Sequence, residues 1–170
     1  MVILGLGSNL LSSFGDRFQN IDRAIFLLNR LGVKIIKKSS YYETPSYPAA
    51  TNPKFINVIV QAKLSLNPKQ LASVIIDVEN KLERKRSKKN APRTCDIDII
   101  DFNSKAFDFE YNGLSFTVPH ERLSIRNFVL FPLNEILPNW RHPVSDDVVV
   151  ELIEKLSSDE KNSILKVEKP

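Results

Sequence analysis

A regular alternation over Phe55–Leu64 constrains the fold more than any other feature of this sequence. Successive side chains of an extended chain point to opposite faces, so every second residue shares a face. One face of this segment is entirely apolar and should pack on helices: Ile56, Val58, Val60, Ala62 and Leu64. The other face places Phe55 beside Asn57. A large ring next to an amide could serve there as a platform for a ligand.

The segments around this strand predict an alternation of strands and helices. An apolar strand over Val2–Leu6 precedes a helix over Phe14–Leu28, whose apolar residues recur at spacings of three and four. A strand over Val33–Tyr42 leads into a proline-rich loop. A helix capped by Asn67 follows the central strand, and a last strand covers Thr94–Ile100.

This order predicts an α+β protein with the ferredoxin-like βαββαβ fold, an antiparallel sheet with both helices packed on one face. We expect additional C-terminal helices, one around Phe128–Ile136 and one capped by Ser145. The stretch that ends at residues 117–120 has no regular pattern. We expect one domain over residues 1–157, followed by a polar, frayed tail over 158–170. The second face of the sheet would be free, and a functional site belongs there or in the loops.

Composition narrows the class of protein. No run of about 18 apolar residues is present, so we expect no membrane span. The segment Met1–Gly5 lacks the basic start of a secretory signal. The single cysteine, Cys95, has no partner for a disulfide or a zinc site. We therefore expect a cytoplasmic protein, and because nothing in the sequence demands an oligomer, we expect a monomer.

Two carboxylates, Asp96 and Asp98, share one face of a strand with strongly apolar flanks. They would lie about 7 Å apart, so they repel each other unless a positive group lies between them. They could be scattered surface charges. However, a polar face on an interior strand costs free energy to maintain. Hard cations such as Mg²⁺ prefer carboxylate oxygens and share their shells with phosphates, so the pair indicates a magnesium–polyphosphate site.

A cation-rich segment opens directly onto this strand. Residues 84–93 contain six lysines and arginines. Such a run forms either a solvated loop or a site for an anion, polyphosphate or nucleic acid. No phosphate-binding glycine loop is present, because Gly5-Leu6-Gly7 lacks the third glycine of such motifs. A bound nucleotide would therefore be held by side-chain cations and metal.

The segment Ala91–Ile100, APRTCDIDII, closely resembles the signature of the 6-hydroxymethyl-7,8-dihydropterin pyrophosphokinases of folate biosynthesis. That pattern is a small residue, Pro, Arg, two variable positions, Asp-hydrophobic-Asp and two more hydrophobic residues. Further segments are similar to those of the family and occur in the same order: Gly7–Leu10, Tyr42–Pro45, Phe55–Asn57, Val118–His120 and Arg126–Phe128. The resemblance extends over roughly residues 1–157.

This resemblance implies transfer of pyrophosphate from ATP, the co-substrate, to the hydroxymethyl group of the pterin, with release of AMP. Asp96 and Asp98 would hold two Mg²⁺ ions and act in catalysis together with Arg84 and Arg93. The residues implied in ATP binding are Glu79 (at the ribose), Arg84, Arg86, Arg93, Ile99 (at the adenine, through its backbone), Thr117, His120 and Arg126.

For the pterin, the resemblance implies a sandwich between two rings and a set of polar contacts around its edge. The residues are Phe55 and Phe128 for the rings, and Asn57, Thr44 and Pro45 for the edge. The loops Thr44–Pro53 and Arg84–Pro92 would act as lids that exclude water. The partners would be these small molecules alone, without nucleic acid or membrane.

Two other classes of protein remain open at this point. A nucleic-acid-binding module of the same fold would use the basic loop on phosphates and the aromatic residues for stacking. Asp96 and Asp98 count against it, because they would repel a phosphate backbone. A metal nuclease built on the same two carboxylates would leave the aromatic platform unexplained.

Overall fold

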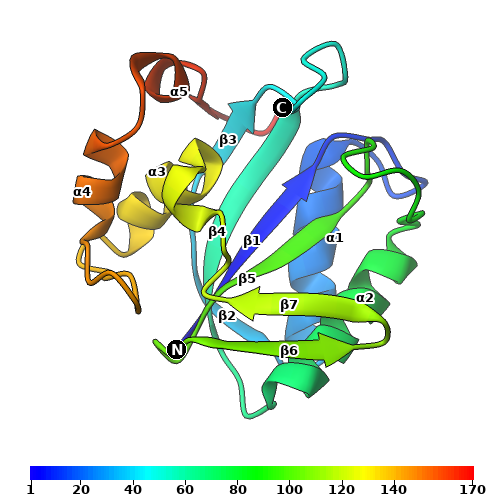
Figure 1. Cartoon of the computed structure of the whole chain (residues 1–170). Coiled ribbons are helices and arrows are strands. Elements are labelled where there is room, and N and C mark those ends of the chain that lie inside the picture. Colours follow the sequence, from blue (N-terminus) through cyan, green and yellow to red (C-terminus); the bar gives the residue numbers. More distant parts are fainter.

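An antiparallel sheet organises the computed structural model, which describes residues 1–170 (Figure 1). Its strands follow the order β5-β1-β4-β3-β8, and β2 pairs with β4 beside β3. Their bounds are β1 Val2–Ser8, β2 Lys34–Lys38, β3 Tyr41–Thr44, β4 Phe55–Lys63, β5 Asp96–Phe102 and β8 Leu165–Val167. The predicted ferredoxin-like arrangement is confirmed, with β2 and β3 together in the place of one strand.

Helices α1 (Arg17–Arg30) and α2 (Pro68–Lys81) cover one face of this sheet (Figure 1). Each begins with a capping box, formed by Asp16 for α1 and by the predicted Asn67 for α2. The apolar face of β4 packs into the core between sheet and helices, as its alternation predicted. Helix α1 begins at Arg17 rather than at Phe14, which is exposed.

The second face of the sheet is not free, contrary to our expectation. Helices α3 (Asn127–Ile136) and α4 (Val149–Glu154) pack over part of it. They form a second core around three sheet residues, Ile3, Ile59 and Ile100. The candidate site lies on the same face, near the carboxyl end of β1.

The stretch that we expected to be irregular forms a hairpin of β6 (Phe107–Tyr111) and β7 (Leu114–Val118). Its two turn residues, Asn112 and Gly113, adopt φ values of 51° and 73°. Such positive φ angles suit Asn-Gly in a tight hairpin turn, so the sequence carried this signal. The hairpin packs against α2 and ends in the segment that leads to His120.

Three local expectations were wrong for identifiable reasons. The strand predicted over Val33–Tyr42 is broken at Ser39, whose hydroxyl accepts a hydrogen bond from the backbone N–H of Ile59. Ser145 does not cap α4; its hydroxyl donates to Asp147. The tail is not frayed, because it forms α5 (Ser158–Asn162) and β8.

That residues 1–157 form one domain stays a prediction. None of the helices has the length and apolar character needed to cross a membrane.

Candidate functional site

Two glycines of β1 form the floor of a trough between the neighbouring strands. Gly7 lies opposite Asp96 on β5 and Asn57 on β4, and Gly5 lies opposite Asp98. A Cβ atom on Gly7 would lie 3.1 Å from Asn57 Oδ1 and 3.5 Å from the ring of the neighbouring Phe55. The missing side chain at Gly7 therefore lets Asn57 and Phe55 approach β1 closely, and both glycines line a cavity between an acidic strand and an aromatic one.

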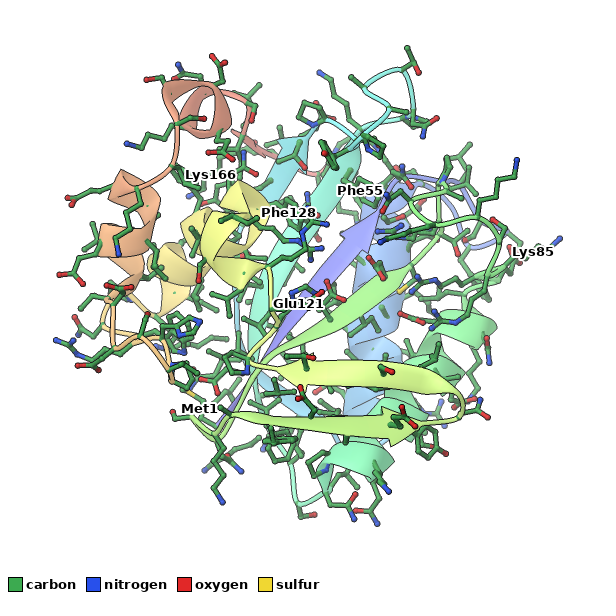
Figure 2. All side chains as sticks on the ribbon, in the orientation of Figure 1. Met1, Phe55, Lys85, Glu121, Phe128 and Lys166 are labelled. Atoms are coloured by element: carbon green, nitrogen blue, oxygen red, sulfur yellow. The ribbon has the colours of Figure 1, made fainter.

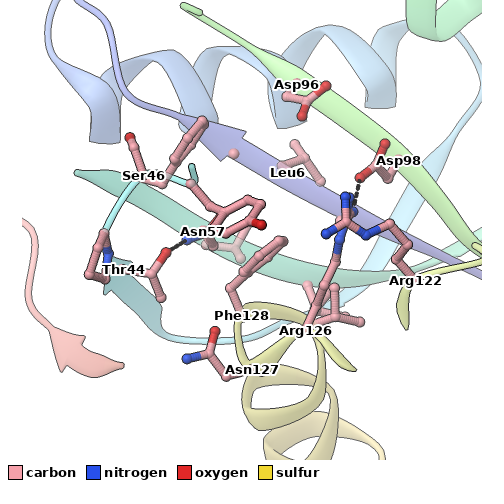
Figure 3. A pocket seen from close by; sticks show the side chains of 18 of the residues that line it. Leu6, Thr44, Ser46, Asn57, Asp96, Asp98, Arg122, Arg126, Asn127 and Phe128 are labelled. Atoms are coloured by element: carbon pink, nitrogen blue, oxygen red, sulfur yellow. Dashed lines mark hydrogen bonds and ion pairs between the residues drawn. The ribbon is translucent and has the colours of Figure 1, made fainter. Parts of the chain in front are cut away.

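Asp96 and Asp98 lie side by side on the trough side of β5 (Figure 3). Residues Cys95, Ile97 and Ile99 point into the opposite core, so the predicted sharing of a face is confirmed. The exposed fractions of the two side chains are 21% for Asp96 and 31% for Asp98. Both carboxylates are thus partly buried but accessible to a ligand.

Four cationic or titratable groups surround this pair. Arg84 Nη1 and Arg93 Nη2 each lie 2.8 Å from a carboxylate oxygen of Asp96. Arg126 Nη1 lies 3.2 Å from Asp98 Oδ2, and His120 Nε2 lies 3.8 Å from the same atom.

These neighbours shift the pKa values in opposite directions. Burial raises the pKa of Asp96, but Arg93 and Arg84 together bring it below its ordinary value. Burial and the charge of Asp96 raise the pKa of Asp98. Burial lowers the pKa of His120, although Asp98 opposes this effect. A cation placed at the pair would favour the ionised form of both carboxylates.

Glu79 of α2 borders the cavity around which most of the residues predicted for the nucleotide lie, but its carboxylate is bound by protein donors. Its side chain is 3% exposed, and both of its oxygens accept hydrogen bonds within the protein. The donors are Arg84 Nη1 at 2.6 Å, Arg86 Nη2 at 2.9 Å and the backbone N–H of Ile97 at 2.9 Å. Burial raises its pKa to about 7, against the opposing charge of Arg84. Glu79 thus holds Arg84 and Arg86 in place, and its contact with a ribose stays a prediction.

Most of the other residues predicted for the nucleotide lie around a cavity of about 360 Å³ between α2, β5 and β7, whereas Arg93 and Arg126 line a different cavity. It is lined by Arg84, Arg86, Asp96, Asp98, Ile99, Thr117 and His120, among others. The remaining lysines of the basic segment, Lys85, Lys88 and Lys89, line neither cavity described here. Figure 2 shows Lys85 at the outer edge of the molecule. The arginines of the segment thus border the two cavities, whereas its lysines are exposed to solvent.

All residues predicted for the pterin line a second, larger cavity of about 490 Å³. They are Thr44, Pro45, Phe55, Asn57 and Phe128. Figures 2 and 3 show Phe128 on α3 across the cavity from β4, which carries Phe55 and Asn57. Asn57 Nδ2 donates to Thr44 Oγ1 at 2.9 Å, which fixes the orientation of this amide.

Two arginines connect the aromatic rings to the carboxylates. The guanidinium carbon of Arg93 lies 5.1 Å from the ring centroid of Phe55, and that of Arg126 lies 5.3 Å from the centroid of Phe128. The same two side chains pair with Asp96 and Asp98. The two cavities therefore meet at the carboxylate pair, with cations at the junction.

Sequence reasoning missed several residues that line the larger cavity. Gly5 and Gly7 were considered as an incomplete phosphate loop, and Gly7 also as the start of a segment similar to the family, but neither was placed in a ligand cavity. Asn127, Glu160 and Ser163 also line this cavity. No sequence signal could have placed the last two, because the tail reaches the site only through tertiary pairing of β8 with β3.

Comparison with known proteins agrees with this geometry. The family model described as 7,8-dihydro-6-hydroxymethylpterin-pyrophosphokinase (HPPK) matches residues 3–138. A 2-amino-4-hydroxy-6-hydroxymethyldihydropteridine pyrophosphokinase from Bacillus subtilis is 39% identical over 134 residues, which cover 78% of this chain and 75% of that protein. Its counterpart from Synechocystis is 33% identical over 155 residues, covering 91% of this chain and 75% of that protein.

Among solved structures, a Plasmodium falciparum HPPK-DHPS triple mutant with pteroate superposes with a TM-score of 0.74 at 15% identity. The match covers 99% of this chain and 46% of that chain. This chain thus spans less than half of that longer protein, and at this identity the likeness supports the fold alone.

Proposed function

The chain belongs to the 7,8-dihydro-6-hydroxymethylpterin-pyrophosphokinase family, and from that premise we propose how its residues perform the reaction. It transfers pyrophosphate from ATP to the hydroxymethyl group of 6-hydroxymethyl-7,8-dihydropterin in folate biosynthesis. Because the two outer phosphates of ATP leave together, the second product is AMP.

Asp96 and Asp98 would hold magnesium at the junction of the two cavities. No cluster of three or more His, Cys, Asp or Glu side chains that could hold a metal ion is present. Two carboxylates nevertheless fit Mg²⁺, which is commonly bound by one or two carboxylates together with substrate phosphates and water. We propose two ions, which when bound would neutralise phosphoryl oxygens and stabilise the attacking and leaving oxygens.

Arg84, Arg93 and Arg126 would bind the phosphates of ATP. Without ligand, these guanidinium groups neutralise the two carboxylates. With cations bound at the carboxylates, the arginines would be available to phosphate oxygens, which a guanidinium group can bind with two parallel hydrogen bonds. Arg86 would join them, oriented by Glu79. Thr117, His120 and the backbone of Ile99 would complete the nucleotide site.

The pterin would lie between Phe55 and Phe128 in the larger cavity. Offset stacking contributes roughly 0.5–1.5 kcal/mol per aromatic pair beyond the burial of apolar area. Asn57 and the backbone at Thr44 and Pro45 would bind the polar edge of the ring. The loops Thr44–Pro53 and Arg84–Pro92 would close over the substrates and exclude water, so that ATP is not hydrolysed.

The meeting of an aromatic cavity and a cationic cavity at one pair of carboxylates is the observation that carries this proposal. An assay of AMP release with ATP, Mg²⁺ and the reduced hydroxymethylpterin tests it. AMP should form only when all three are present. A folded protein that releases no AMP under these conditions would overturn the proposal.

The same preparation distinguishes the nucleic-acid-binding module. Affinity for single-stranded RNA that weakens steeply with salt, without affinity for Mg-ATP, would favour that class. The carboxylate pair between the two cavities argues against it. A monomeric state and a cytoplasmic location stay predictions.

A further inference from the structure

Asn127, the first residue of α3, lies between Arg126 and Phe128 and has no role in the function proposed above. Its side chain is only 9% exposed and borders the larger cavity. Its amide nitrogen donates two hydrogen bonds, to the backbone carbonyl of Glu160 at 2.6 Å and to Ser163 Oγ at 2.9 Å. Both amide protons of Asn127 are thus donated to the C-terminal segment.

These two bonds determine which way the amide points. A backbone carbonyl can only accept, so the nitrogen of Asn127, not its oxygen, must face Glu160. Ser163 gives its own hydroxyl proton to the same carbonyl at 3.1 Å, so it accepts from Asn127. No hydrogen bond within the protein reaches Asn127 Oδ1. Figure 3 shows this oxygen turned toward the cavity, on the side of Thr44 and Asn57.

The segment that imposes this orientation, Ser157–Val167, is called the strap here. Its β8 pairs with β3, Ser157 caps α5, and Lys166 Nζ lies 3.7 Å from Glu135 Oε2 on α3. The strap lies outside residues 3–138, which match the family model. It is therefore a feature of this chain that the family match does not account for.

We propose that Asn127 is a specificity-determining residue that accepts a hydrogen bond from the exocyclic amino group of the pterin, and that the strap holds it in this orientation. The inference rests on the proposed function. A pterin carries donors on its amino group and on the adjacent ring nitrogen. In both Asn57 and Asn127 the amide nitrogen donates to the protein, to Thr44 and to Ser163, respectively. The amide oxygens are therefore left to accept from a ligand. Together they offer acceptors to that donor edge.

The test measures pterin affinity by titration in the presence of Mg²⁺ and an unreactive ATP analogue. Asn127→Ala should weaken binding by about 3- to 10-fold, the worth of one neutral hydrogen bond. Ser163→Ala, which removes one of the two anchors and leaves the core intact, should weaken it by about 2- to 3-fold. A matched control is Asp159→Asn on the exposed side of the strap, which should bind as the wild type does.

The discriminating ligand is the 2-desamino analogue of the pterin. All four proteins should bind it with equal affinity, because the group that Asn127 would recognise is absent. Equal losses for both ligands would show that Asn127 only supports the cavity wall, and wild-type affinity of Asn127→Ala for the pterin would also overturn the inference. A wild-type protein that binds no pterin would instead overturn the proposed function and this inference with it.

Discussion

Replacing Asp98 with Asn should abolish most of the activity and leave the fold intact. The change keeps the size and shape of the side chain but removes the charge that would bind magnesium. If magnesium supplies several kcal/mol of transition-state stabilisation, AMP release should fall by about 100-fold or more.

The effect on stability should be small because two terms oppose each other. The neutral amide of the Asp98→Asn protein would no longer repel Asp96, a repulsion of about 2 kcal/mol for charges about 7 Å apart at an effective dielectric constant of about 20. The change would also lose the ion pair with Arg126 at 3.2 Å, in which the side chains are 20% and 31% exposed. Such partly exposed pairs contribute up to about 1 kcal/mol. Because the lost repulsion exceeds the lost ion pair, Asp98→Asn should raise the free energy of unfolding by about 1 kcal/mol. This corresponds to a rise in Tm of about 2–4 °C.

The experiment pairs an AMP-release assay with thermal unfolding of the same samples. Asp146→Asn is a matched control, because that carboxylate is 82% exposed, in a loop whose residues line neither cavity. Its activity and Tm should equal those of the wild type. A folded Asp98→Asn protein with wild-type AMP release would refute the metal assignment. A large loss of Tm would instead show that Asp98 is needed for folding.

Three further predictions follow from the geometry. Phe55→Ala should weaken pterin binding by about 10-fold and ATP binding by less than about 2-fold, because it removes one ring of the sandwich; equal losses for both ligands would mean that Phe55 is simply core. The folded protein keeps a proton on Glu79 up to about pH 7, whereas the unfolded chain releases it near 4.5. The free energy of unfolding should therefore fall as pH rises from about 4.5 to about 7, by up to about 3 kcal/mol relative to the Glu79→Gln protein. Urea unfolding of both proteins at pH 5 and pH 8 measures this. The same difference in unfolding free energy between the two proteins at both pH values would disprove it. Trp140→Phe removes the indole N–H that donates to the buried Asp101 at 2.8 Å. The free energy of unfolding, measured with denaturant, should fall by about 1–3 kcal/mol, and the KM values for ATP and for the pterin should not change. Unaltered stability would contradict the importance of this hydrogen bond.

The parts of the fold that the sequence predicted correctly are those governed by local patterns. The alternation in β4 and the cap at Asn67 each depend on neighbours in the chain, so they could be recognised without a structure. The same is true of Asp96 and Asp98, whose shared face follows from their spacing on a strand. The hairpin at Asn112-Gly113 carried a comparable signal that was overlooked.

The parts that could not be predicted depend on contacts between distant segments. A glutamate on α2 can face a ligand or the protein interior, and only the positions of Arg84 and Arg86 show that Glu79 is buried. The strap is polar, so its composition suggests disorder. It is ordered because β3 offers an unpaired edge and because Asn127 on α3 supplies two donated hydrogen bonds.

The two glycines of β1 determine the shape of the candidate site. The trough is encoded by side chains that are missing at alternate positions, directly across from the acidic groups on one neighbouring strand and from the ring-bearing strand on the other. A methyl group added at Gly7 would lie 3.1 Å from Asn57 Oδ1, so the amide that would meet the pterin would have to shift. The shape of the site therefore depends on the side chain that β1 lacks at Gly7 as well as on the carboxylates beside it.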